Sequence, residues 1–85
     1  MKTSMKEGSF VKVLPSASQT KYTTPPHDWI NWEEGMEQFI GQVCIVYKIY
    51  QKSVRVRLYT SSKYDTSFSF LFEDIQVLEI GRAHV

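Results

Sequence analysis

The stretch GQVCIVYKIYQKSVRVRLY, residues 41–59, decides the fold. Its second half alternates Val54, Val56 and Leu58 with Arg55, Arg57 and Tyr59, which is the period-two pattern of a β-strand with one buried face. Its first half also alternates, and we expect Val43, Ile45, Tyr47 and Ile49 to share the inner face. The short polar segment Gln51-Lys52-Ser53 between the halves predicts a β-hairpin.

Three further strands flank this hairpin. Residues 10–14 (FVKVL) are rich in β-formers and are followed by Pro15. Residues 67–72 (SFSFLF) alternate again, with Phe68, Phe70 and Phe72 on one face. After the acidic break Glu73-Asp74, residues 75–78 form a last short strand, and residues 60–66 are expected to be a polar loop.

The connection between the first two strands combines a loop and a helical segment. Residues 15–28 contain Pro15, Pro25 and Pro26 and predict a long loop, which in a small domain is usually functional or disordered. Beyond it, Trp29, Trp32, Met36 and Phe39 lie three and four residues apart, which indicates a short helix or helical turn at about residues 31–39. Asn31 is the expected cap and Gly41 the expected end.

Together these elements predict a mainly β fold, a small five-stranded barrel in one domain spanning residues 8–79. Its expected core draws on every strand and on the helical segment, from Val11, Val13, Trp32, Met36, Phe39, Val43, Ile45, Val54, Val56, Phe70 and Ile75.

Composition narrows the functional class. The chain has 85 residues, 42% hydrophobic and 22% charged, with a formal net charge of +1. It has no apolar run long enough for a membrane span and no signal-peptide pattern, so we expect a cytoplasmic protein. The single cysteine, Cys44, excludes an internal disulfide, and with His27 and His84 it does not make a zinc site.

Both ends of the chain are expected to lie outside the barrel. Residues 1–7 are polar, and Met5 is as plausible a start as Met1. Residues 79–85 read EIGRAHV, which is also the translation of the common short-read sequencing adaptor AGATCGGAAGAGCACACGTC preceded by one G. We therefore expect that residues 80–85 are not native, that the sequence comes from assembled environmental DNA, and that Arg82 and His84 have no functional role. Without residues 80–85 the net charge is zero.

The spacing resembles that of a group of short phage and bacterial proteins. The resemblance covers residues 8–79 and rests on Gly8, Val11 and Val13, on Trp32-x3-Met36-x2-Phe39-x-Gly41-x-Val43-x-Ile45, and on Phe72-Glu73-Asp74-Ile75-x-Val77-Leu78. These proteins carry a Src-homology-3-like (SH3-like) barrel akin to mind-bomb-type repeats. The resemblance implies an SH3-like barrel of phage or prophage origin, in a bacterial host, with no common chemistry. This chain departs from the usual pattern by carrying Phe70 or Phe68 where tryptophan is common in the fourth strand.

Enzymatic chemistry is not indicated. Cys44 lies within a strand pattern, and His27 is the only credible partner base for it. Glu33 and Glu37 share a helix face that is more typical of a solvated surface than of an acid–base or metal site. The glycines are isolated, so no phosphate-binding loop is present. We expect no catalytic residue, no metal and no cofactor.

Two binding surfaces are candidates. A peptide groove between the long loop and the aromatic strands would be lined by Tyr22, Pro25, Pro26, Trp29 and Tyr59. A basic-aromatic strand face suited to single-stranded nucleic acid would comprise Lys48, Lys52, Arg55, Arg57 and Tyr59. We expect Trp29, Tyr59 and one of the two arginines to lie on one connected surface. For Trp32, whose spacing to Met36 and Phe39 is a packing pattern, a core position is favoured.

The sequence therefore predicts a non-enzymatic binding module. A protein or peptide partner is the first choice and nucleic acid the second. A third class is a structural virion or assembly component whose barrel contacts copies of itself.

Overall fold

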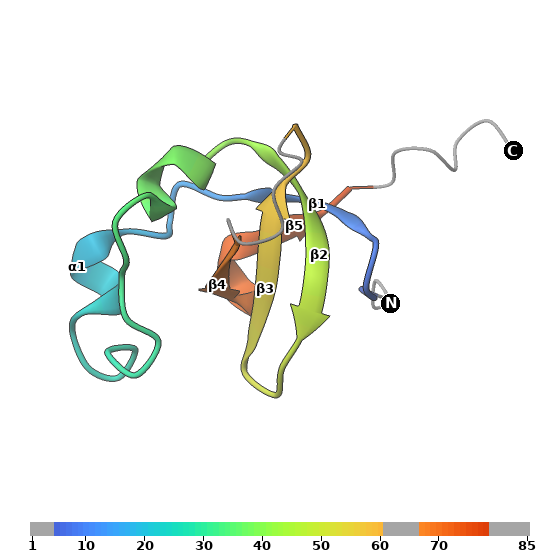
Figure 1. The fold of residues 1–85 in the computed structure, drawn as a ribbon. Coiled ribbons are helices and arrows are strands. Elements are labelled where there is room, and N and C mark those ends of the chain that lie inside the picture. The colour runs from blue at the N-terminus through green and yellow to red at the C-terminus, as the bar shows by residue number, and fades with distance from the viewer. Residues whose placement is uncertain (1–4, 61–66, 79–85) are drawn as a thin grey trace, which may run out of the picture.

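The structure, a computed structural model, describes residues 5–60 and 67–78 and confirms the mainly β fold. Five antiparallel strands form one sheet in the order β4-β3-β2-β1-β5 (Figure 1). Their bounds are β1 Phe10–Val13, β2 Val43–Ile49, β3 Ser53–Leu58, β4 Ser67–Leu71 and β5 Ile75–Val77. In Figure 1, β2 and β3 run across the direction of β1 and β5, which shows that the sheet is strongly curved.

Strands β2 and β3 form the predicted hairpin. The Tyr50 amide donates to the Ser53 carbonyl at 2.8 Å and closes the turn. Val46 pairs with Val56 but Lys48 pairs with Arg55, so Tyr47 is an extra residue in β2, a β-bulge. The bulge reverses the alternation of β2 from that point on. Lys48 therefore shares a face with Arg55, and Ile49 lies on the same side as the buried Val54.

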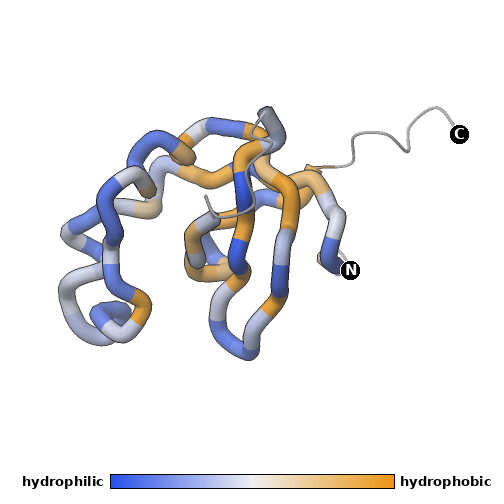
Figure 2. Tube along the Cα trace, in the orientation of Figure 1, coloured by the Kyte–Doolittle hydropathy of each residue, from blue (hydrophilic) through white to orange (hydrophobic). Residues whose placement is uncertain are grey.

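The core confirms most of the predicted residues but corrects the orientation of β2. Val11, Val13, Val54, Val56, Phe70 and Ile75 are buried together with Met36 and Phe39. In β2, however, Cys44 and Val46 are buried, whereas Val43 and Ile45 are only partly buried and lie on the other face. Both faces of β2 are apolar near its start, so alternation alone does not distinguish them. Figure 2 accordingly shows a continuous hydrophobic colour at the start of β2, whereas β3 alternates between hydrophobic and hydrophilic colour.

The connection between β1 and β2 contains two short helical elements. One turn of α-helix, α1 (Gln19–Tyr22), interrupts the predicted loop, and the Ser18 side chain caps it by accepting from the Lys21 amide at 3.1 Å. The predicted helical turn is present as a 3₁₀ helix, η1 (Met36–Phe39), but it does not begin at Asn31. Asn31 adopts a left-handed φ of 65°, and Gly35 precedes η1 with φ 103°. A side chain at Gly35 would contact the Phe68 ring at 3.4 Å and strain the backbone.

Rings from this connection cover one end of the core. Tyr22 and Trp32 pack edge to face at 5.4 Å between ring centroids, and Phe39 contacts Phe68 at 5.3 Å and Phe70 at 5.9 Å. Trp32 is half-buried against Tyr22 and Phe70, which confirms its predicted packing position. The connection is therefore part of the core and not a free loop.

The acidic break between the last two strands is a second 3₁₀ helix, η2 (Phe72–Asp74). Phe72 begins this helix and is exposed, so it does not share the inner face of Phe68 and Phe70 as predicted. Asp74 is fully buried. Residues 61–66 of the polar loop expected at 60–66, and the expected adaptor-derived residues 80–85, lie outside the described residues.

Candidate functional site

The outer face of the sheet gathers the basic and aromatic residues predicted for β2 and β3. Alternation with buried neighbours and the strand register bring to this face Phe10, Lys12, Val43, Ile45, Lys48, Arg55, Arg57, Tyr59, Ser67, Ser69 and Gln76. Tyr59 follows the last residue of β3, and its amide donates to the Val43 carbonyl at 2.9 Å, which extends the pairing by one residue. None of these outer positions, all of them described, carries an acidic side chain.

Two aromatic rings meet on this face. Phe10 of β1 and Tyr59 at the end of β3 pack edge to face, with centroids 5.5 Å apart and an interplanar angle of 87°. Strand β2 lies between β1 and β3, so the ring pair spans β2 beside Val43 and Ile45. This contact helps to explain why Val43 and Ile45 are only partly exposed although they point away from the core.

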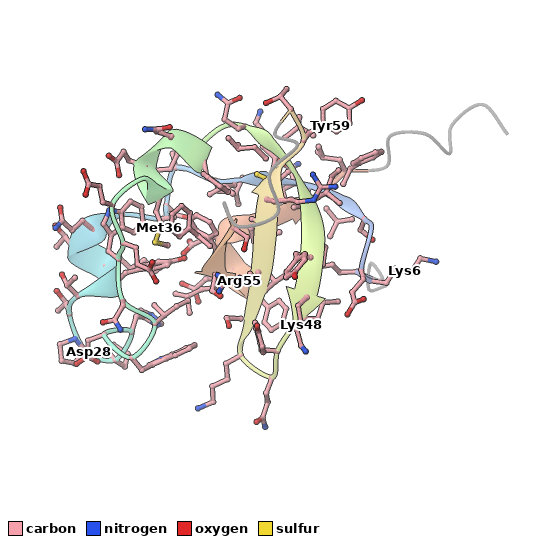
Figure 3. The ribbon with its side chains drawn as sticks, viewed as in Figure 1. Lys6, Asp28, Met36, Lys48, Arg55 and Tyr59 are labelled. Atoms are coloured by element: carbon pink, nitrogen blue, oxygen red, sulfur yellow. The ribbon has the colours of Figure 1, made fainter. Side chains whose placement is uncertain are left out.

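Arg55 is held in place at the centre of the face. Its Nε donates to the Ser67 hydroxyl at 2.8 Å and its Nη2 donates to the Ser67 carbonyl at 3.2 Å. Figure 3 shows Arg55 on the middle of the hairpin, with Lys48 and Tyr59 toward its opposite ends. The guanidinium is therefore positioned before any ligand arrives.

The turn end of the hairpin adds two more exposed aromatics. Tyr47, the bulge residue, is 46% exposed. The Lys48 ammonium lies 6.0 Å from the centroid of the exposed Tyr50 ring, a weak cation–π contact. Lys52 is exposed in the turn itself. All five residues of the predicted nucleic-acid face thus lie on the β2–β3 hairpin or directly after it.

The residues predicted to line a peptide groove do not converge. Tyr22 is 0% exposed, because its ring packs in the core and its hydroxyl binds Asp74, so it does not line a surface groove. Pro25 and Pro26 are exposed and joined by a cis peptide bond, and Trp29 is 48% exposed. Figure 3 places Asp28, the neighbour of Trp29, at the opposite end of the molecule from Tyr59. The expected connected surface from Trp29 to Tyr59 is therefore not formed by a shared groove.

A partly buried polar cluster, which we call the clasp, joins the first connection to η2. Its members are Ser16, Lys21, Tyr22 and Asp74. The Asp74 carboxylate accepts hydrogen bonds from the Ser16 hydroxyl, from the Lys21 ammonium at 2.9 Å and from the Tyr22 hydroxyl at 2.7 Å. Lys21 also pairs with the exposed carboxylate of Glu73 at 2.6 Å.

The clasp shifts the pKa of each ionisable member. Burial alone would raise the pKa of Asp74, but the three donated hydrogen bonds and the charge of Lys21 outweigh it and lower that pKa. Burial and the hydrogen bond to Asp74 raise the pKa of Tyr22 well above its ordinary value. For Lys21, burial acts to lower the pKa, but the bonds to Glu73 and Asp74 outweigh it and raise that pKa. Each side chain of the clasp has a hydrogen-bond partner inside it, and no buried side-chain nitrogen or oxygen among the described residues lacks one. The clasp therefore has the character of a structural element.

The candidate catalytic residues Cys44, Glu33 and Glu37 do not form a common site. Cys44 is a buried free thiol whose pKa burial raises to about 12, and its Sγ lies 3.6 Å from the Gln42 carbonyl oxygen. Glu33 lies before η1, so Glu33 and Glu37 do not form the predicted pair on one helix. Within residues 5–60 and 67–78, no group of three or more His, Cys, Asp and Glu side chains is arranged to hold a metal ion. In the same part of the chain, no helix has the length and apolar character needed to cross a membrane.

Comparison of the chain with protein-family models, with curated proteins and with solved structures found no match. The functional assignment therefore rests on the geometry above.

Proposed function

We propose that this protein is a non-enzymatic binding module that takes up single-stranded nucleic acid on the outer face of its sheet. The observation that carries the proposal is the composition of that face, where four cationic residues, Lys12, Lys48, Arg55 and Arg57, are interleaved with exposed aromatic rings and no described strand position is acidic. Cations follow the phosphate backbone and rings stack on bases.

The distribution of acidic residues supports the same face. Outside the clasp and its neighbour Glu73, the described acids are Glu7 before β1 and Asp28, Glu33, Glu34 and Glu37 in the first connection. The near-zero net charge thus conceals a separation of charge, with the cations concentrated on the sheet. A local basic face attracts a polyanion even when the whole molecule is nearly neutral.

A salt titration of oligonucleotide binding tests the proposal. A fluorescently labelled oligothymidylate is titrated with protein and its anisotropy measured at several salt concentrations. We expect a Kd of about 1–100 µM at physiological salt, and tighter binding at low salt, with a log–log slope of about −0.7 for each phosphate contacted. Arg57→Gln and Lys48→Gln should each weaken binding and reduce the slope. Lys6→Gln, an exposed lysine away from this face, is the matched control (Figure 3). Absence of binding at low salt contradicts the proposal.

A peptide ligand is the second candidate, and the exposure of Trp29 beside Pro25 and Pro26 favours it. A partner at this end would contact Trp29 and not Tyr59. Its binding would depend little on salt concentration and would be abolished by Trp29→Ala. A self-assembling virion component is the remaining class, which sedimentation of the purified chain would test by its oligomeric state.

We propose also that the barrel is SH3-like and phage or prophage encoded. The support is the five-strand order with one long first connection, together with an acidic turn, now seen as η2, before the last strand. The genes adjacent to this one on its source DNA would test the origin.

A further inference from the structure

We infer that Tyr59 and Phe10 form a stacking subsite for one nucleobase, with Lys12 and Arg57 holding the phosphates on its two sides. The inference rests on the proposed nucleic-acid function and goes further by assigning the place where a base binds. Phe10 and Lys12 come from β1, outside the basic stretch that the sequence pattern identifies.

The Tyr59 ring is exposed to solvent and is also ordered by a neighbouring ring. Tyr59 is 56% exposed, and its edge-to-face contact with Phe10 fixes the orientation of its ring. In such a contact the edge of one ring meets the face of the other. Whichever way the pair is arranged, at least one face of the Tyr59 ring is left uncovered by Phe10. An exposed ring that is already ordered loses less conformational entropy when a base stacks on it.

The cations lie on the two sides of the ring pair. Lys12 pairs with Val43, whose carbonyl accepts from the Tyr59 amide, so Lys12, Val43 and Tyr59 form one row across the sheet. Arg57 pairs with Ile45, which pairs with Phe10, so these three form the next row. The two rings therefore occupy one diagonal of these rows, and Lys12 and Arg57 occupy the other. Arg57 is two residues from Tyr59, about 6.8 Å along the strand, and Lys12 is two strands away, about 10 Å. A base on Tyr59 would thus have one cation along the strand and one across the sheet for its flanking phosphates.

The chemistry of these rows selects a nucleic acid over an apolar peptide. The described side chains around the pair are cationic, neutral polar or aliphatic, including Gln76 opposite Lys12 and Ser67 opposite Arg57. An apolar peptide would gain from the rings but would bring no counter-charge to the exposed Lys12 ammonium. A nucleotide satisfies both, because its base is an aromatic plane and its phosphates are anionic.

The test compares two probes that differ only in their bases. One is an oligothymidylate of about eight nucleotides, and the other is an abasic oligonucleotide with the same number of phosphates. Stacking on one ring predicts that the wild-type protein binds the first probe roughly 5- to 150-fold more tightly than the second. Tyr59→Leu should remove most of this preference without changing the affinity for the abasic probe, and Tyr59→Phe should retain it.

The control and the contrary outcomes are distinct. Tyr50→Leu removes another exposed tyrosine, at the far end of the hairpin, and should retain the preference. If the wild-type protein binds both probes equally, or if Tyr59→Leu keeps the full preference, the subsite is wrong while the proposed function stands. If neither probe binds, the proposed function itself fails. The wild-type comparison needs no variant, so a folding defect in Tyr59→Leu does not prevent a decision.

Discussion

The Tyr22 hydroxyl donates a 2.7 Å hydrogen bond to the buried carboxylate of Asp74 and accepts one of 2.9 Å from the Leu71 amide. One phenolic oxygen thereby joins the first connection to both ends of η2. The donor and the carboxylate are 52 residues apart in the sequence. This bridge ties the segment that covers the core to the last turn of the sheet.

Tyr22→Phe is expected to lower the free energy of unfolding by about 2–4 kcal/mol. The ring still fills the core, but the Leu71 amide loses its acceptor and Asp74 loses a donor. Urea denaturation measures the change, and Tyr50→Phe, which removes an exposed hydroxyl, should stay within about 0.5 kcal/mol of wild type. Equal stability of the two variants would show that the bridge contributes nothing.

Asp74→Asn is expected to cost about 3 kcal/mol, because the fully buried Asp74 carboxylate accepts three hydrogen bonds and pairs with the Lys21 ammonium, and a neutral amide with one oxygen cannot replace all of these interactions. Glu73→Gln removes the exposed partner of the same lysine and should cost less than about 1 kcal/mol. The same urea titration compares them. A larger loss for Glu73→Gln than for Asp74→Asn would contradict the assignment of Asp74 as the centre of the clasp.

The contribution of Asp74 should disappear in acid. Its pKa is lower in the folded than in the unfolded state, where the ordinary value is 3.8. The stabilisation is therefore fully present above that pH and is lost as the pH falls through the folded-state pKa. Urea midpoints measured between pH 7 and acid pH should show the gap between wild type and Asp74→Asn closing as the pH falls. A gap that stays constant down to about pH 2 would falsify this account.

Cys44 should be unreactive in the folded protein. Burial raises its pKa from 9.0 to about 12, which lowers the thiolate fraction at pH 8 by about a thousandfold. Reaction with a chromogenic disulfide reagent should be slow in buffer and rapid in concentrated urea. Rapid labelling of the native protein would mean that the thiol is accessible, contrary to its position in the core.

The sequence predicts the sheet well because alternation is a local property. Val54 and Val56 are separated by charged residues, so their strand has one possible inner face, and the structure buries both. Strand β2 has apolar residues on both sides, and its register places Cys44 opposite the buried Val11 of β1 and Val46 opposite the buried Val56 of β3. This register is not a property of residues 43–49 alone.

The clasp could not be found from local patterns. Asp74 stands beside Glu73 in an acidic dipeptide that reads as a solvated break, and its partners lie 52 to 58 residues away. Its burial depends on the donors that the first connection brings to it.

The outer face of the sheet, by contrast, is partly predictable from the sequence, because Arg55, Arg57 and Tyr59 come from one strand pattern. Phe10 and Lys12 join it only because β1 pairs with β2.

The extra residue in β2 also governs how the hairpin tolerates changes in length. Before Tyr47 the even-numbered residues of β2 point toward the core, and after it the odd-numbered residues do. If β2 kept all its residues but paired without the bulge, strict alternation would carry the Lys48 ammonium to the side of Val54 and turn Ile49 outward. Removal of Tyr47 itself would instead leave Val46 opposite Val56 and Lys48 opposite Arg55. A hairpin shortened by this one residue should therefore keep its cation on the face of Arg55.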